Sequence, residues 1–316
     1  MEKDINHSLI EMELQRNTLV KERDELKEHL ERISDENKEL EKYKTWALPG
    51  HYYSPIPSLE DIKSREESIF NKTPTQIPGI DLNLEEQISL LNKFETYYKV
   101  QPFSEEQNGS LRYYFNNPFF EHSDALTLNF MINHLKPKRI LEVGSGYSSA
   151  VTLDTNEISF NNEIKCTFIE PYPERLLSLV KESDNINLFE KKLEDVNLSE
   201  FSQLEAGDIL FIDSTHVSKI GSDVNYIFFE ILPHINKGVH IHFHDVIYPF
   251  EYPKEWIYEG RAWNEAYLLR TFLQFNDSFR IKYWGSSLNT PDKRYLFNKM
   301  PLLGTKGGSI WIEKIK

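Results

Sequence analysis

The chain contains one stretch that constrains its fold more than any other, RILEVGSGYSS at residues 139–149. Its apolar start, residues 139–143, predicts a buried parallel strand, and a helix is expected from Tyr147 onward. Gly144 and Gly146 would form the tight turn between them, because glycine allows backbone angles and close approaches that a Cβ atom blocks. Such a turn directs backbone N–H groups and a helix N-terminus at a nucleotide-like ligand. An ordinary strand-to-helix turn is the alternative for so short a pattern.

The 316 residues can hold one sizeable core plus an appendage, or two small domains. The apolar content of 39% and the aromatic content of 13% are typical of a globular protein. A net charge of −14 argues against nucleic acid or an anionic membrane as the main partner, since both require a basic surface. The polar start, the lack of an apolar run of about 18 residues and the single Cys166 predict a cytoplasmic protein without a signal peptide, a membrane span or an internal disulfide.

Residues 1–46 differ from the rest of the chain because they are highly charged and contain neither proline nor glycine. Apolar residues recur there at every seventh position, namely Ile5, Met12, Leu19, Leu26, Ile33 and Leu40. If these are d positions, Leu9, Leu30 and Asn37 fall at a positions, together with several charged residues. An unbroken d row with a half-polar a row predicts a coiled coil for self-association, with a single solvated helix as the alternative.

The remaining sequence falls into two parts. Residues 47–120 combine a helical pattern at 84–98 with loops and aromatic residues, and we expect a helical cap or linker there. Residues 121–316 begin with a predicted helix at 123–135 and then alternate between strand and helix patterns. The predicted strands are residues 139–143, 165–170, 186–190, 208–213, 239–244, 279–284 and 309–315.

Helix patterns lie between these strands, for example at residues 173–181, 218–232 and 264–275. Continuous apolar strands that alternate with helices predict an α/β fold with a Rossmann-like, doubly wound parallel sheet. Only a loop rich in Gly, Pro and Asn separates the last two strands, so we expect these to form an antiparallel edge pair.

Ligands of such a sheet bind at the carboxyl ends of its strands. The polar residues and glycines at the strand ends are, in chain order, Glu142 with Gly144 and Gly146, then Glu170, Glu194 with Asp195, Asp213, and His244 with Asp245. A carboxylate at Glu170 can accept hydrogen bonds from two ribose hydroxyls. An acid at Asp195, or at its neighbour Glu194, can meet the exocyclic amine of adenine. The arrangement therefore predicts a nucleoside site.

This order of residues resembles that of the class I S-adenosylmethionine-dependent methyltransferases. Their first motif, Glu/Asp-x-Gly-x-Gly, matches the first strand end, and the resemblance covers about residues 120–316. It implies that the ribose acid is Glu170, that the adenine-contacting acid is Asp195, and that S-adenosylmethionine is the cofactor. It leaves the predicted coiled coil and most of the cap without an explanation.

Two rival functions are compatible with parts of the sequence. A dinucleotide dehydrogenase would use NAD and would also place an acid after the second strand. Its Gly-x-Gly-x-x-Gly fingerprint, however, requires a third small residue at a position that Ser149 occupies here, and it does not require Glu142. A non-catalytic assembly protein would use the coiled coil and keep the sheet as a scaffold. Binding of S-adenosylhomocysteine or of NAD separates these functions.

Two strand ends carry residues suited to chemistry. Asp213 and His216 follow the fourth strand, and His244 and Asp245 close the fifth. Adjacent parallel strands lie about 4.8 Å apart, so Asp213 and Asp245 could share a divalent cation such as Mg²⁺. His244 or His216 as a further ligand would favour a transition metal. Without a metal, Asp213 could orient the acceptor or the amino group of the cofactor.

The pair of strand ends resembles the metal-dependent O-methyltransferases, and more closely a bacterial branch with Asp-x-x-His and His-Asp motifs. In the catechol-type members a lysine base lies three residues after the first aspartate, where this chain has His216. A histidine near its unperturbed pKa is a competent base, and His244 is a second candidate. A third metal ligand is not evident, since Val246 follows Asp245.

An aromatic loop follows at residues 248–263. It could form the wall of an acceptor site, with Glu251 or Arg261 binding polar groups, or it could pack as a lid or a subunit contact. Aromatic surfaces suit sugar rings and planar metabolites. Together with the resemblance, the loop predicts O-methylation of a glycan or small-metabolite hydroxyl.

Overall fold

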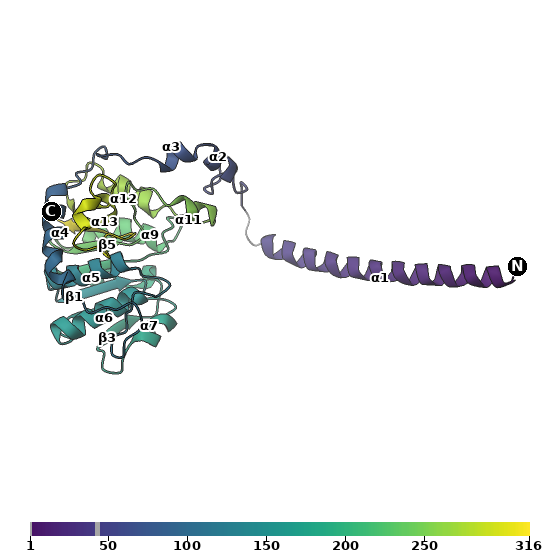
Figure 1. Cartoon of the computed structure of the whole chain (residues 1–316), viewed down its shortest axis with the longest axis horizontal. Helices are drawn as coiled ribbons and strands as arrows, with labels where there is room; N and C mark the ends of the chain where they lie inside the picture. Colours follow the sequence, from purple (N-terminus) through teal and green to yellow (C-terminus); the bar gives the residue numbers. More distant parts are fainter. Residues whose placement is uncertain (1, 42–44) are drawn as a thin grey trace. The chain divides into compact units, whose positions relative to one another are not determined.

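The computed structural model describes residues 2–41 and 45–316 (Figure 1). The chain divides into two compact units, one up to Asp61 and one from Ile62 to Lys316. Within the described residues, no helix is both long and apolar enough to cross a membrane.

The first unit is dominated by α1 (Glu2–Glu41). Its apolar d positions are exposed: Met12, Leu19 and Leu26 by 57%, 62% and 62%, and Ile33 by 39%. The side chains at the other heptad positions named above, Ile5, Leu9, Asn37 and Leu40, lie outside the described residues. The predicted helix is present, and the pairing expected of a coiled coil stays a prediction.

The second unit is built on a seven-stranded sheet in the order β3-β2-β1-β4-β5-β7-β6. The strands are β1 (Arg139–Val143), β2 (Lys165–Ile169), β3 (Ile186–Phe189), β4 (Ile209–Ile212), β5 (His240–Phe243), β6 (Phe279–Trp284) and β7 (Ile310–Lys314). The first five are parallel, and β7 is antiparallel to both β5 and β6. The predicted doubly wound, Rossmann-like sheet is confirmed.

The last two strands form the expected antiparallel pair, with β7 placed inside and β6 at the edge. Burial explains this order. Ile310, Trp311 and Ile312 of β7 are fully buried, whereas β6 exposes Arg280. The more apolar strand therefore takes the position with two neighbours.

Helices cover both faces of the sheet, and successive strand residues alternate between two apolar cores. Ile140 belongs to the core with α4 (Leu84–Tyr98), α5 (His122–Leu135), α6 (Tyr147–Phe160) and α7 (Glu174–Leu179). Leu141 belongs to the core on the other face, with α8 (Leu198–Ser202), α9 (Asp223–Tyr226), η2 (Ile227–Ile231), α10 (Leu232–His234) and α12 (Glu265–Leu273). The remaining short helices are α2 (Leu59–Ser64), α3 (Glu66–Phe70), η1 (Leu193–Asp195), α11 (Lys254–Tyr258), α13 (Gly285–Leu288) and η3 (Arg294–Phe297).

The helix predicted at 218–232 begins later, at Asp223. Ser222 caps it, because its side chain accepts a hydrogen bond from the N–H of Asn225 at 3.3 Å. The preceding residues form a loop at the carboxyl end of β4.

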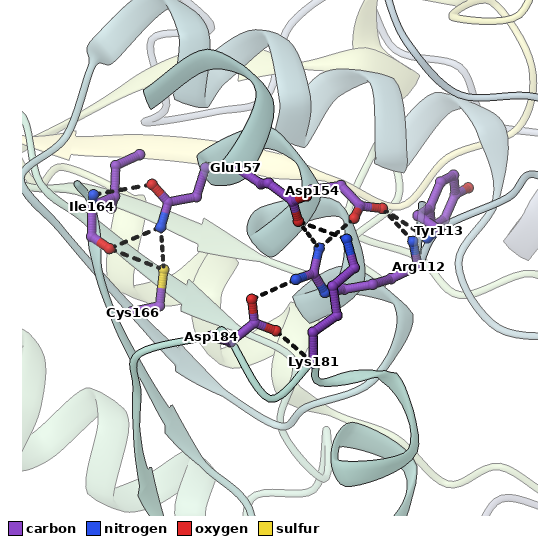
Figure 2. Close-up of polar contacts among 9 residues, drawn as sticks. Arg112, Tyr113, Asp154, Glu157, Ile164, Cys166, Lys181 and Asp184 are labelled. Atoms are coloured by element: carbon purple, nitrogen blue, oxygen red, sulfur yellow. Dashed lines mark hydrogen bonds and ion pairs between the residues drawn. The ribbon is translucent and has the colours of Figure 1, made fainter. Parts of the chain in front are cut away.

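The segment before α5 is fixed to α6 by a buried ion cluster (Figure 2). Arg112, only 4% exposed, donates to Asp154, Glu157 and Asp184 at 2.6, 2.8 and 2.5 Å. The backbone N–H groups of Arg112 and Tyr113 donate to the other oxygen of Asp154 at 2.8 and 2.9 Å. Both the side chain and the backbone of the segment are thereby held against α6. We name Arg112 and its three carboxylates the arginine cluster.

Candidate functional site

A pocket of about 390 Å³ lies at the carboxyl ends of the parallel strands. Its volume is within the range of small-molecule sites. Glycine, acidic and hydroxyl residues from several strand ends line it, among them Gly144, Glu170, Glu194, Asp213, Ser214 and Thr215. The structure therefore brings Gly144, Glu170, Asp213 and the alternative acid Glu194 to one pocket, whereas the predicted Glu142, Gly146 and Asp195 do not line it.

Gly144 forms the floor of this pocket, and glycine is required there. Its φ is +78°, and a Cβ atom would lie 2.0 Å from the carbonyl oxygen of Asp213. The N–H of Gly144 donates to Ile169 at 3.0 Å, and the N–H of Asp213 donates to Val143 at 2.9 Å. These backbone hydrogen bonds join the carboxyl ends of β1, β2 and β4 at the turn. At Gly146 a Cβ atom would meet only the flexible side chain of Arg175, at 3.1 Å.

Glu170 is tied to the turn by its carboxylate. One oxygen accepts from the N–H of Ser145 at 3.1 Å and the other from the N–H of Tyr172 at 2.9 Å. Each carboxylate oxygen has capacity for a further donor. After β3, Glu194 lines the pocket, whereas the predicted Asp195 is exposed and does not line it. Both lie on the single turn η1, which turns Glu194 toward the pocket.

Glu142 lies fully buried behind the turn. One carboxyl oxygen accepts from the hydroxyls of Ser148 and Ser149 at 2.6 and 2.8 Å, and the other has no partner among the described residues. Burial raises the pKa of Glu142 to about 8, although the two serine hydroxyls lower it in part. The first acid of the predicted motif is therefore protonated at neutral pH.

His216 is the centre of a charged cluster at the ends of β4 and β5. Its Nδ1 lies 2.8 Å from Oε2 of Glu265. Its Nε2 lies 3.3 Å from Oδ1 of Asp213 and 3.8 Å from Oδ2 of Asp245. His216 is 5% exposed and Glu265 1%, whereas the side chains of Asp213 and Asp245 are 36% and 21% exposed. We name these four residues the histidine cluster.

The backbone at this cluster is strained. His216 and Asp245 have φ values of 60° and 55°, which few residues other than glycine adopt. Hydrogen bonds to neighbouring segments hold this backbone: the N–H of Glu265 donates to the carbonyl of His216, and the N–H of Val246, the residue after Asp245, donates to the carbonyl of Gly308. Strain of this kind occurs where the fold directs particular side chains at one another.

The cluster also sets the charges of its members. Burial alone would lower the pKa of His216, but its contacts with Asp213 and Glu265 outweigh burial and raise the pKa to about 10. Burial would raise the pKa of Asp213, but His244 and His216 lower it. The sequence predicted a histidine near its unperturbed pKa. The contacts with Asp213 and Glu265 instead raise the pKa of His216, and the sequence did not reveal Glu265 as a neighbour.

His244 occupies a second buried position, 3.6 Å from Asp245 through its Nε2. Burial would lower its pKa, and the charges of Asp245, Asp213 and Asp124 raise it. Beneath it, Nε2 of His242 contacts the hydroxyl of Ser309 at 3.0 Å, and this hydroxyl donates to Asp124 at 2.5 Å. His242 is fully buried.

Comparison with known proteins supports the assignment made from these strand ends. A family model described as "Methyltransferase domain" matches residues 141–246, which run from β1 to the end of β5. An uncharacterised protein of Archaeoglobus fulgidus is 40% identical over 161 residues, which cover 50% of this chain and 73% of that protein. Residues 141–246 therefore form a methyltransferase domain.

Solved methyltransferases resemble the fold distantly. The S-adenosylhomocysteine-bound PaMTH1 of Podospora anserina is 15% identical, with a TM-score of 0.39 over 83% of this chain and 99% of that one. The O-methyltransferase TomG of Streptomyces achromogenes is 12% identical, with a TM-score of 0.40 over 81% and 96%.

The methyltransferase does not assemble the predicted metal ligands into a metal site. Among the residues that the structure describes, no three His, Cys, Asp or Glu side chains are placed to hold an ion together. Asp213 and Asp245 instead flank Nε2 of His216. The imidazole of His216 therefore lies between the two carboxylates that were expected to share a cation, and binding of a metal by these residues stays a prediction.

The aromatic loop of the methyltransferase reaches the histidine cluster. The ring of Trp263 lies 4.3 Å from that of His216, centre to centre. The guanidinium of Arg261 lies over Trp256 and Trp263, with its Cζ 4.7 and 4.9 Å from their rings. Glu251 accepts from the hydroxyl of Tyr267 at 2.5 Å, so its position is set by α12.

Glu265 and Asp124 are the main site residues that the sequence did not reveal. Glu265 begins α12, where an acid is also expected for helix stability alone. Asp124 lies in the first turn of α5 for the same reason. Only the tertiary structure shows that their carboxylates face His216 and the buried Ser309.

Proposed function

We propose that this methyltransferase transfers a methyl group to a hydroxyl oxygen of a glycan or a small metabolite. The proposal depends chiefly on the histidine cluster. His216 is oriented through Nδ1 by Glu265, and its Nε2 faces the carboxylates of Asp213 and Asp245. These carboxylates are partly exposed, and Asp213 lines the pocket. A group that handles the proton of a hydroxyl therefore lies next to the cofactor pocket.

The pocket fits S-adenosylmethionine by the chemistry of its polar atoms. Glu170 would accept hydrogen bonds from the ribose hydroxyls and Glu194 from the adenine amine, in place of Asp195. Gly144, with no space for a side chain, would allow the cofactor to lie against the backbone, and Asp213 would meet the ammonium group. The cofactor supplies an activated methyl group, so the main task of the protein is to position the acceptor oxygen.

The acceptor hydroxyl must lose its proton as its oxygen gains the methyl group. We assign this proton to the histidine cluster, in which three carboxylates surround one imidazole. Asp245 would receive it at an exposed oxygen while Asp213 meets the ammonium group of the cofactor, and His216 would hold both carboxylates in place. His244, closer to Asp245 than to any other acid of the cluster, would support that carboxylate. A proton-transfer group of this kind contributes roughly 10²- to 10⁴-fold in rate.

The aromatic loop would form the acceptor wall. Trp263 packs on His216, and Arg261 lies across Trp256 and Trp263, so an acceptor that reaches the cluster would lie beside an aromatic face. Aromatic faces bind the apolar side of sugar rings and of planar metabolites, and a guanidinium adds hydrogen bonds to their polar groups.

The decisive experiment is calorimetric titration with S-adenosylhomocysteine and with NAD, followed by a turnover assay on a panel of monosaccharide and phenolic hydroxyls. We expect binding of S-adenosylhomocysteine and not of NAD, with binding lost in Gly146→Trp. A Cβ atom at Gly146 would meet only the flexible side chain of Arg175, and circular dichroism checks that the variant is folded. Turnover should survive EDTA. Dependence on Mg²⁺ or Mn²⁺ would instead make Asp213, Asp245 and His244 metal ligands, and binding of NAD alone would contradict the proposed function.

We also propose that α1 pairs with a second copy of the chain as a coiled coil. Its support is the row of exposed apolar d residues at heptad spacing. The double variant Leu19→Lys and Leu26→Lys should sediment as a smaller species with unchanged turnover. Glu28→Lys, which lies outside both apolar rows, should keep the size of the natural chain. A natural chain that sediments as a monomer would contradict the pairing.

A further inference from the structure

Arg175 of α7 is an unpaired cation beside the glycine turn. Its guanidinium has no ion-pair or hydrogen-bond partner within residues 2–41 and 45–316. Its Cδ lies 3.1 Å from the place where a Cβ atom on Gly146 would be. The pKa of Asp213 is raised by burial and lowered by nearby cations, of which Arg175 is one. The charge of Arg175 therefore acts on Asp213 of the pocket, although Arg175 does not itself line the pocket and no acid among the described residues contacts its guanidinium.

The guanidinium is held in place by an aromatic ring. Its Cζ lies 3.9 Å from the ring centre of Phe119, a cation–π contact. The ring of Phe119 also stacks on Tyr147, the first residue of α6, with centres 6.2 Å apart and planes 26° apart. Arg175 is exposed at the protein surface, so this stacking restricts a side chain that would otherwise be free to move.

Phe119 is itself fixed by its chain segment. The side-chain oxygen of Asn117 accepts from the N–H groups of Phe119 and Phe120 at 3.1 and 2.8 Å. Farther back, the arginine cluster holds the start of the segment against α6 (Figure 2). The segment therefore fixes the position of the Phe119 ring, and this ring fixes the position of the Arg175 guanidinium.

We propose that Arg175 binds the carboxylate at the amino-acid end of the cofactor and that Phe119 orients it for this contact. The inference rests on the proposed function. With Glu170 and Glu194 holding ribose and adenine, the amino-acid end would extend along the glycine turn, where Asp213 can meet only its ammonium group. The carboxylate then needs a cation, and a stacked guanidinium offers two parallel N–H donors at little further loss of freedom. The segment at 112–120 thereby becomes part of the cofactor site.

Lys219 is the competing cation, because it also lines the pocket. Lys219 lies in the loop that follows Asp213 at the end of β4. Among the described residues, no aromatic ring contacts its ammonium group. The two cations are separated by comparing ligands with and without the amino-acid end. S-adenosylhomocysteine has this end, whereas 5′-methylthioadenosine lacks both its carboxylate and its ammonium group.

The test is calorimetric titration of both ligands into the natural chain and into Arg175→Leu, Arg175→Lys, Phe119→Leu and Lys219→Leu. The variant Arg294→Leu, at an exposed arginine of η3, is the matched control. We expect Arg175→Leu to weaken S-adenosylhomocysteine binding by roughly 10- to 100-fold and to leave 5′-methylthioadenosine binding unchanged. Arg175→Lys should recover part of the loss, and Phe119→Leu should show a smaller loss with the same ligand dependence.

Three outcomes would overturn the inference. Unchanged S-adenosylhomocysteine binding in Arg175→Leu would remove the contact, and an equal loss for both ligands would mean that Arg175 acts on the shape of the pocket. A loss confined to Lys219→Leu would assign the carboxylate to Lys219. In each of these cases the natural chain still binds S-adenosylhomocysteine, so the proposed function stands. Failure of the natural chain to bind it would contradict both.

Discussion

Two clusters in the second unit each place one cation among three carboxylates, and they differ in every other respect. Arg112 is surrounded by Asp154, Glu157 and Asp184, and His216 by Asp213, Asp245 and Glu265. The contacts of Arg112 measure 2.5 to 2.8 Å, whereas those of His216 extend from 2.8 to 3.8 Å. Similar charges thus form a tight cluster in one place and a loose one in the other.

Their chemistry and position explain the difference. A guanidinium never loses its proton in a protein, and the arginine cluster is not part of the pocket wall, so it can only hold chain segments together. An imidazole can exchange its proton, and two carboxylates of the histidine cluster are open to a ligand. We infer that the arginine cluster serves stability and the histidine cluster serves the reaction.

Replacement of His216 should have the largest effect and should fall on turnover. In His216→Gln, we expect turnover to decrease by roughly 10²- to 10⁴-fold, or about 3–5 kcal/mol in activation free energy. Glutamine keeps a polar side chain, so the affinity for S-adenosylhomocysteine should change only slightly. The measurement is kcat at saturating cofactor together with calorimetric affinity.

The matched variant is Glu265→Gln, which keeps an acceptor for Nδ1 of His216 but removes the charge. It should reduce kcat less than His216→Gln does, and the double variant should be no slower than His216→Gln alone, because both residues act as one unit. Additive losses would mean that Glu265 acts separately from His216, and the comparison of the two clusters would lose its basis.

The next largest effect concerns the arginine cluster and should fall on stability. Arg112→Met leaves Asp154 and Asp184 without their cation, whereas Glu157 keeps Lys181 at 2.7 Å, so the free energy of unfolding should decrease by about 3–5 kcal/mol. Turnover of the folded protein at saturating cofactor should stay the same. Urea denaturation and kcat, measured side by side, check this prediction. Adding Asp184→Asn to Arg112→Met should restore part of the stability, since it removes one unpaired charge.

These two clusters also show how far the sequence could be interpreted. The glycine turn, the parallel strands and the strand-end acids were predictable, because an apolar run followed by glycines is a local pattern. Asp213 and Asp245 were placed together correctly, since adjacent parallel strands bring their ends to one edge. Glu265 was not predictable as a partner of His216, because 49 positions separate them and only the packing of α12 joins them.

Arg112 illustrates the same limit more strongly. Its partners Asp154 and Asp184 lie 42 and 72 positions away, and nothing in the sequence distinguishes it from a surface arginine. The position of β7 inside the sheet depended likewise on relative burial rather than on strand pattern. Charge states were the least accessible property, because the pKa of His216 depends on contacts that only the folded chain creates.

Glu142 offers the sharpest control, because it is a buried acid with no cation in contact among the described residues. Burial raises the pKa of Glu142 to about 8, from an ordinary value of 4.5. The carboxylates of the arginine cluster differ because they lie beside the permanent positive charge of Arg112. In the folded chain Glu142 keeps its proton at a pH where the unfolded chain has lost it. The stability that the neutral form contributes is therefore fully present below pH 4.5 and is lost as the pH rises to about 8.

The variant Glu142→Gln cannot titrate at this position. Its unfolding free energy should therefore lack a decrease of about 1.4 kcal/mol per pH unit that the natural chain shows between pH 5 and pH 8. Other titrating groups are common to both proteins, so the difference between the two curves isolates Glu142. Ser148→Ala removes one hydroxyl that lowers the pKa, and it should extend the decrease to a higher pH. Parallel curves for the natural chain and Glu142→Gln would mean that Glu142 is charged in the fold, and a buried acid would then need no cation here.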